Sequence, residues 1–96
     1  MGIIISEKIR GKLLEKHNVT EKEVSECFYN RDRKALKDTR EEHDTDPPTL
    51  WVISETNHCR ALKLIFMVKD GNAILKSAYE ANQTEIDLYE RCADHL

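Results

Sequence analysis

The sequence predicts an α+β domain that spans residues 1–96: two N-terminal helices, an antiparallel sheet of three or four strands, and a C-terminal helix. Three observations predict this fold. A chain of 96 residues has room for one modest hydrophobic core. Helix-capping residues precede apolar residues at helical spacing near both ends of the chain. Between these regions lie segments rich in β-branched and large apolar residues, separated by turn-forming residues.

Two short helices are expected at the start of the chain. Ser6 is a favourable N-cap for the first helix, and Asn18 can adopt the left-handed C-cap conformation that ends it. Thr20 and Glu23 have the spacing of a capping box and open the second helix. The apolar face expected for the second helix consists of Val24, Cys27 and Phe28.

Residues 49–56, 60–69 and 73–81 are the expected strands, with a weaker strand around residues 34–39. The last helix should begin at Asn82, which forms a second capping signature with the glutamate three residues on. Its expected apolar stripe is Ile86, Tyr89, Ala93 and Leu96.

Turn residues predict how the strands pair. Asp70 and Gly71 favour a two-residue hairpin turn, and we expect an even-length loop at Asn57 and His58. In this register Leu62 opposes Tyr79, and one sheet face packs beneath the helices. The residues expected on that core face are Trp51, Ile53, Leu62, Leu64 and Phe66.

The opposite sheet face is then too apolar to lie simply in solvent, and an apolar surface of this kind usually has an occupant. Two interpretations stay open: another element of the chain covers this face, or a partner protein or a second copy of the chain binds it. The residues predicted to bind a partner are Lys63, Ile65, Met67, Lys76 and Glu80.

Composition indicates a bacterial-type cytoplasmic protein. The three cysteines have no CxxC spacing, the N-terminal residues do not form a signal peptide, and the longest apolar run is too short to span a membrane. We therefore expect free thiols and no membrane association. Dinucleotide-binding, P-loop, zinc-protease and serine-hydrolase motifs are absent from the sequence, so no cofactor is expected.

The distribution of charge is more informative than the net charge of -3, which disfavours nucleic-acid binding. Residues 31–40 hold five basic and two acidic side chains, whereas residues 41–46 hold four acids and one histidine. The basic stretch is the expected RNA-binding segment, through Arg31, Arg33, Lys37 and Arg40.

The stretch DTREEHDTDPPTLW, residues 38–51, raises the question of a metal or acid/base site. Its carboxylates lack the rigid elements or glycine-bent loop on which Mg²⁺ and Ca²⁺ sites are built, and its paired prolines favour extended backbone leading into a strand. We therefore predict a solvated loop without a metal site. His43 is the residue of this loop that could move a proton near neutral pH.

Two polar clusters on the predicted sheet are candidate sites. One brings Glu55 opposite Arg60 with Tyr79 diagonally adjacent, and the other sets Lys63 diagonal to Lys76 and Glu80. Each could equally be an ordinary cross-strand ion pair. His17 could act as a general base, or it could simply stabilise the end of the first helix.

Three segments, KHNVTEKEV, WVISETNHCRALKLIFMV and ILKSAYEANQTEIDLYE, resemble in order and spacing the BrnT family of bacterial type II toxins. The resemblance covers nearly the whole chain apart from residues 31–48, and it implies a RelE-like ribonuclease that works without a metal and is neutralised by a cognate antitoxin. Tyr79 stands where that family carries an arginine after Ser-Ala. On this basis the predicted catalytic residues are Arg60, Glu55, Tyr79 and His43.

Two other functions remain open. The chain also resembles short bacterial proteins labelled ADP-ribosyl-(dinitrogen reductase) hydrolase, in the DTREEHDTDPPTLW and AYEAN stretches. Alternatively, the apolar sheet face predicts a non-catalytic protein-interaction module.

Overall fold

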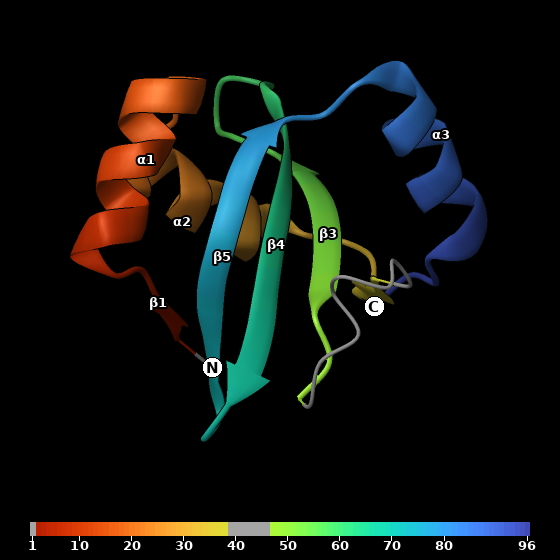
Figure 1. The fold of residues 1–96 in the computed structure, drawn as a ribbon. Coiled ribbons are helices and arrows are strands. Elements are labelled where there is room, and N and C mark those ends of the chain that lie inside the picture. Colours follow the sequence, from red (N-terminus) through yellow and green to blue (C-terminus); the bar gives the residue numbers. More distant parts are fainter. Residues whose placement is uncertain (1, 39–46) are drawn as a thin grey trace.

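The computed structural model describes residues 2–38 and 47–96 and confirms the predicted α+β class. Two N-terminal helices and one C-terminal helix flank a central sheet (Figure 1). In chain order the elements are β1 (Ile3–Ile4), α1 (Glu7–His17), α2 (Glu21–Asn30), β2 (Leu36–Lys37), β3 (Leu50–Glu55), β4 (Ala61–Lys69), β5 (Asn72–Glu80) and α3 (Gln83–Cys92).

The sheet has five strands in the order β1-β5-β4-β3-β2. β2 corresponds to the weaker strand predicted from the sequence, and it pairs antiparallel with β3. β1 was not predicted; it pairs parallel with β5 and makes the sheet mixed. Because β1 has only two residues, it has no alternating pattern to reveal it in the sequence.

All the predicted helix caps are confirmed. The Ser6 side chain accepts a hydrogen bond from the Ile9 N–H at 3.2 Å, and Asn18 is left-handed with a φ of 52°. Both bonds of the capping box form at the start of α2, and the same arrangement opens α3 at Asn82. These local signals place the ends of the helices, and with them the side chains near those ends.

The predicted turn between β4 and β5 is also confirmed. Asp70 and Gly71 have φ values of 52° and 78°, as a two-residue turn with two left-handed residues requires. The strand pairs predicted next to this turn are present: Val68 with Ala73, and Phe66 with Leu75.

Farther from the turn, the predicted pairing of β4 with β5 is wrong. A β-bulge interrupts the pairing next to Phe66, and Lys76 is the extra residue on β5. Leu62 therefore lies opposite Glu80, whereas we predicted Tyr79.

The predicted pairing of β3 with β4 is wrong by one residue as well. Cys59 adopts a left-handed φ of 63°, its N–H donates to the Thr56 carbonyl at 2.9 Å, and the Thr56 N–H donates to the Arg60 carbonyl at 2.9 Å. The loop thus holds three residues in place of two, and Glu55 lies opposite Ala61.

These two shifts change which side chains share a face, because neighbouring residues of a strand point to opposite sides. Trp51 and Ile53 lie on the face opposite Leu62, Leu64 and Phe66, which corrects the predicted core. We call the face with Val52, Leu62, Leu64, Phe66, Leu75 and Ala78 the first face, and the face with Trp51, Ile53, Lys63, Ile65, Met67, Ile74, Ser77 and Tyr79 the second face.

The first face packs against α1 and α2 and forms the main core. α2 lies behind the sheet in Figure 1, and the viewer looks onto the second face. The Phe28 and Phe66 rings meet edge to face, with centroids 6.0 Å apart. The Cys27 thiol donates to the Ser54 carbonyl at 3.5 Å, which attaches α2 to β3.

α3 covers part of the second face, on its β3 side. The Trp51 and Tyr89 rings lie 5.4 Å apart, and Ile53 is buried beside them. The Tyr89 hydroxyl lies 3.1 Å from the carbonyls of Arg33 and Lys34, so α3 is also bonded to the segment before β2. None of the helices in the described residues has the length and apolar character of a membrane span.

Candidate functional site

Three ionisable side chains from three elements meet on the second face. Lys63 of β4 and Tyr79 of β5 are opposite each other in the sheet, and Glu85 lies in the first turn of α3. The Glu85 Oε2 atom is 2.9 Å from Lys63 Nζ and 3.3 Å from the Tyr79 hydroxyl. We call Lys63, Tyr79 and Glu85 the polar cluster.

Aromatic rings surround the polar cluster. The Lys63 ammonium lies 4.6 Å from the centroid of the Trp51 ring and 5.8 Å from that of Tyr79. The His17 ring, at the end of α1, meets the Tyr79 ring edge to face at 5.7 Å. These contacts hold the ammonium by cation–π attraction and bring an imidazole next to the cluster.

The polar cluster keeps Glu85 ionised. Burial, the largest influence, would raise the pKa of Glu85, but hydrogen bonds from the Asn82 backbone, Lys63 and Tyr79 outweigh it and the pKa is lowered. The Lys63 and Glu85 side chains keep 12% and 22% of their surface exposed, so the cluster is shielded and still reachable. It can hold an anion at the ammonium and exchange a proton at the phenol.

Arg60 holds separate elements together. Its guanidinium bonds Glu23 at 2.9 Å and Glu80 at 3.2 Å, and it donates to the carbonyls of His17 and Asn18. Bonding to Arg60 is the main reason that the pKa of Glu23 is lowered. The guanidinium is thus bonded to groups at the C-terminal end of α1, the first turn of α2 and the end of β5.

The predicted grouping of Glu55, Arg60 and Tyr79 is not present, because the three-residue loop shifts the pairing of β3 with β4 and the bulge shifts the pairing of β4 with β5. Glu55 lies opposite Ala61 and lines a cavity of about 520 Å³ between the β3–β4 hairpin and α3. Asp32 shares that cavity with Glu55. Tyr79 alone of the three lies in the polar cluster.

Two of the predicted RNA-binding arginines, Arg31 and Arg33, are engaged within the protein. Arg31 donates to the Phe28 carbonyl and stacks over the Phe28 ring, with its guanidinium carbon 4.1 Å from the centroid. Arg33 donates to the carbonyls of Glu90 and Ala93 and so caps the C-terminal end of α3.

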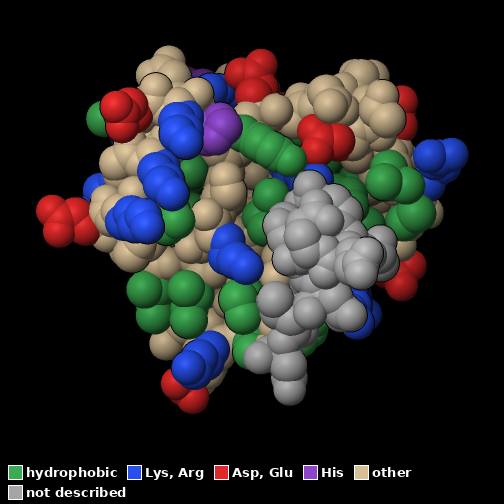
Figure 2. All heavy atoms as spheres, viewed as in Figure 1, with side chains coloured by type: hydrophobic (Ala, Val, Ile, Leu, Met, Phe, Trp, Pro, Cys, Tyr) green, Lys and Arg blue, Asp and Glu red, His purple; other side chains and the backbone are tan. Residues whose placement is uncertain are grey.

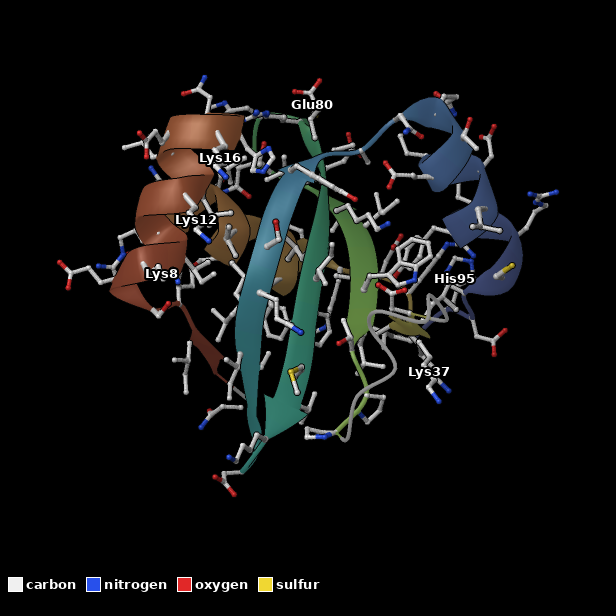
Figure 3. All side chains as sticks on the ribbon, viewed as in Figure 1. Lys8, Lys12, Lys16, Lys37, Glu80 and His95 are labelled. Atoms are coloured by element: carbon white, nitrogen blue, oxygen red, sulfur yellow. The ribbon has the colours of Figure 1, made fainter. Side chains whose placement is uncertain are left out.

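Three members of the predicted sets remain: Lys37, Arg40 and His43. Lys37 is exposed on β2, near the C-terminal end of the chain (Figure 3). Arg40 and His43 lie outside the described residues.

The predicted partner-binding residues are divided between the faces: Lys63, Ile65 and Met67 lie on the second face, whereas Glu80 lies opposite Leu62 of the first face. Lys63 belongs to the polar cluster and lies opposite Tyr79, so the predicted diagonal to Glu80 is wrong. Ile65 is 6% exposed. Met67 is half-buried, Lys76 is exposed in the bulge of β5, and Glu80 bonds Arg60.

Sequence reasoning missed two features of this region. Glu85 was recognised only as a capping residue, because its approach to Lys63 depends on how α3 packs against the sheet. Lys8, Lys12 and Lys16 are exposed along one side of α1 (Figure 3), and their four-residue spacing was the signal available in the sequence.

Within residues 2–38 and 47–96, no group of three or more His, Cys, Asp or Glu side chains is placed to hold a metal ion.

Comparison with known proteins relates the fold to a toxin. No family model matches the chain, and no curated protein matches it significantly. Among solved structures, the chain is similar to the ribonuclease toxin BrnT of Brucella abortus, whose crystal structure was determined at 1.1 Å resolution. The two are 25% identical, the match covers 86% of this chain and 99% of BrnT, and the TM-score is 0.62. The resemblance predicted from the sequence motifs is therefore confirmed, and the protein has a BrnT-like fold.

Proposed function

We propose that this protein is a BrnT-like toxin that cleaves RNA, with the polar cluster and His17 as its reacting site. The similarity to a ribonuclease toxin supports the class of activity. The observation that carries the choice of site is the convergence of Lys63 and Tyr79 on one Glu85 oxygen, beside His17.

The chemistry follows from what RNA cleavage requires. The ribose 2′-oxygen attacks the adjacent phosphorus while the bond from phosphorus to the 5′-oxygen breaks, which leaves a 2′,3′-cyclic phosphate and a 5′-hydroxyl. The reaction needs a proton acceptor, a proton donor and a cation beside the phosphate. In our proposal His17 takes the 2′-hydroxyl proton, Tyr79 donates toward the leaving oxygen, and Lys63 stabilises the phosphate.

Glu85 has a positioning role in this proposal. A carboxylate with a lowered pKa is a weak base, which makes it poorly suited to remove a hydroxyl proton. Its Oε2 atom instead holds the Lys63 ammonium and the Tyr79 hydroxyl side by side.

The test is cleavage of a labelled RNA oligonucleotide by the purified chain, with analysis of the product ends. His17→Gln and Tyr79→Phe should each lower the rate by about 10²-fold, since each removes one proton-transferring group. His58→Gln is the matched control, because His58 is exposed in the β3–β4 loop. Intact RNA with a folded wild-type chain would reject the proposed activity, and full activity in His17→Gln would reject the proposed base.

Expression of the chain alone in bacteria provides a test in cells. Growth should stop and transcripts should fragment, and His17→Gln should relieve both effects. Normal growth with intact RNA would favour the alternative function, a non-catalytic interaction module.

We further propose that a cognate antitoxin is the partner of this chain and binds the exposed part of the second face. Co-expression with the product of the neighbouring reading frame tests this. Ile65 is too buried for an informative surface substitution, whereas Lys76 is exposed on β5. Lys76→Glu should weaken the complex, and Lys22→Glu on α2 is the control. Equal binding by wild type and Lys76→Glu would exclude this part of the face.

A further inference from the structure

A column of basic side chains runs along α1. Lys8, Lys12 and Lys16 are exposed on the side of the helix that faces the viewer in Figure 3. Residues four apart in a helix repeat about every 6 Å along its axis, so the three ammonium groups form a row. Figure 2 shows this row of basic side chains at one edge of the second face and a further basic side chain over the middle of the sheet. We call Lys8, Lys12 and Lys16 the lysine column.

The charges of the lysine column are not neutralised within the described part of the chain. No described carboxylate lies within ion-pair distance of Lys8, Lys12 or Lys16, and Glu15 between them is exposed and unpaired with them. By contrast, Arg10 on the same helix pairs with Glu21 at 2.9 Å. Although the net charge of the chain is -3, this edge of the molecule is positive.

The lysine column leads to the polar cluster. α1 packs beside β5 and ends at His17, whose ring contacts Tyr79. Lys76, the extra residue in the β5 bulge, is exposed beside this path, and the half-buried Ile74 lies on the same strand. A row of cations that passes a weakly apolar surface and a tyrosine ring is the arrangement that suits a single-stranded nucleic acid.

We propose that the lysine column is the track along which the backbone of single-stranded RNA is held as it crosses α1 and β5 toward the polar cluster. This inference rests on the proposed function, and it names the binding surface that the substrate uses outside the reacting site. An acidic protein partner is the less favoured occupant, because lysine is depleted at protein–protein interfaces relative to the rest of the surface. The exposed Leu14 of α1 lies on the opposite side of the helix from Lys12 and Lys16, by helical periodicity.

The experiment measures binding of a short fluorescent RNA whose 2′-hydroxyls are methylated, so that it cannot be cleaved. The wild-type chain is compared over a range of salt concentrations with the triple variant Lys8→Gln, Lys12→Gln, Lys16→Gln. Loss of three phosphate contacts should lower the slope of log affinity against log salt by about 2 for a single strand. The matched control is Lys22→Gln, Lys69→Gln, Arg91→Gln, which removes the same charge from exposed residues outside the lysine column and outside residues 31–40.

The outcomes separate this inference from the proposed function. The inference would be overturned if the two triple variants had the same effect on RNA affinity and on its salt dependence. It would also be overturned if polyaspartate, at the same concentration of negative charge as the RNA, displaced the RNA from the wild-type chain. If the chain cleaves RNA and the lysine column variant cleaves as well as the control, the proposed function stands and the track is rejected. If the chain binds RNA through the column but leaves cleavable RNA intact, the track stands and the proposed activity fails.

Discussion

At the scale of single residues, the side chains that were expected to react or to bind RNA divide into structural and reactive groups. Arg60 is satisfied by two carboxylates and two carbonyls, and Arg33 by two carbonyls at the end of α3. Cations bound this fully have few donors left for a phosphate. Lys63 differs because it is held by one carboxylate and two ring faces, and its Glu85 partner could exchange for a phosphate oxygen.

The Arg60–Glu23 contact makes stability depend on pH. The pKa of Glu23 is lowered in the folded chain, so this contact stabilises the fold above the ordinary glutamate pKa of about 4.3 and is lost as pH falls through the folded value. Glu23→Gln should lower the free energy of unfolding by about 1–2 kcal/mol at neutral pH and make its acid dependence shallower. Urea unfolding at several pH values measures both effects.

Two features make this substitution informative. Glutamine can still accept the Thr20 N–H in the capping box through its single oxygen, so the change keeps the cap and removes the bond to Arg60. The control is Glu21→Gln, whose ion pair with Arg10 is about half exposed at 50% and 52% and should contribute less than about 1 kcal/mol. If the two variants showed the same acid dependence, the role assigned to the Arg60–Glu23 contact would be wrong.

At the scale of elements, the sequence predicted what local chemistry determines. The caps at Ser6, Thr20 and Asn82 and the Asp70–Gly71 turn depend on a few neighbouring residues, and all were confirmed. The strand register depended on two features without a local signal. Cysteine seldom adopts a left-handed conformation, so nothing in the sequence marked Cys59. Lys76, the extra residue, is as compatible with a regular alternating strand as with a bulge, so it carries no local signal either.

Replacing Cys59 tests the cause of the register shift. Because Cys59 has a φ of 63° and glycine adopts this conformation without steric cost, Cys59→Gly should raise the free energy of unfolding by up to about 1 kcal/mol. The control is Cys92→Gly at the end of α3, where glycine should destabilise the helix by up to about 1 kcal/mol. Thermal or urea unfolding measures both variants. A loss of stability in Cys59→Gly would mean that the side chain matters more than the backbone conformation.

At the scale of the whole molecule, the sheet has a large core on its first face and a smaller one under α3. The candidate site lies at the edge of the smaller core, where side chains from several elements meet. The sequence could therefore reveal some members of the site but not that they lie together. Tyr79 was predicted as a catalytic residue, and Lys63 as a partner-binding residue in a separate polar cluster. Their meeting with Glu85 and His17 requires α3 and α1 to reach the same edge of the sheet. No pattern of neighbouring residues contains that information.

The unequal cores predict that α3 opens before the rest of the fold. α2 buries Val24, Cys27 and Phe28, whereas α3 buries only Tyr89 among its described residues. Elements with few buried apolar contacts exchange their amide hydrogens through local opening, so the amides of α3 should exchange faster than those of β4. Tyr89→Phe should increase exchange in α3 by about fivefold, since it removes the hydroxyl contacts with the carbonyls before β2, worth about 1 kcal/mol.

Hydrogen exchange read by mass spectrometry measures this directly, and Tyr29→Phe is the control because Tyr29 is 88% exposed on α2. Since α3 carries Glu85, each opening of the helix separates the carboxylate from Lys63 and Tyr79. Tyr89→Phe should therefore lower the rate of RNA cleavage only in proportion to the fraction of molecules in which α3 is open. The exchange rates of the β4 amides should stay unchanged. Equal exchange rates in α3 and β4 of the wild-type chain would show that the two cores unfold as one unit, and the polar cluster would then be as stable as the sheet that carries it.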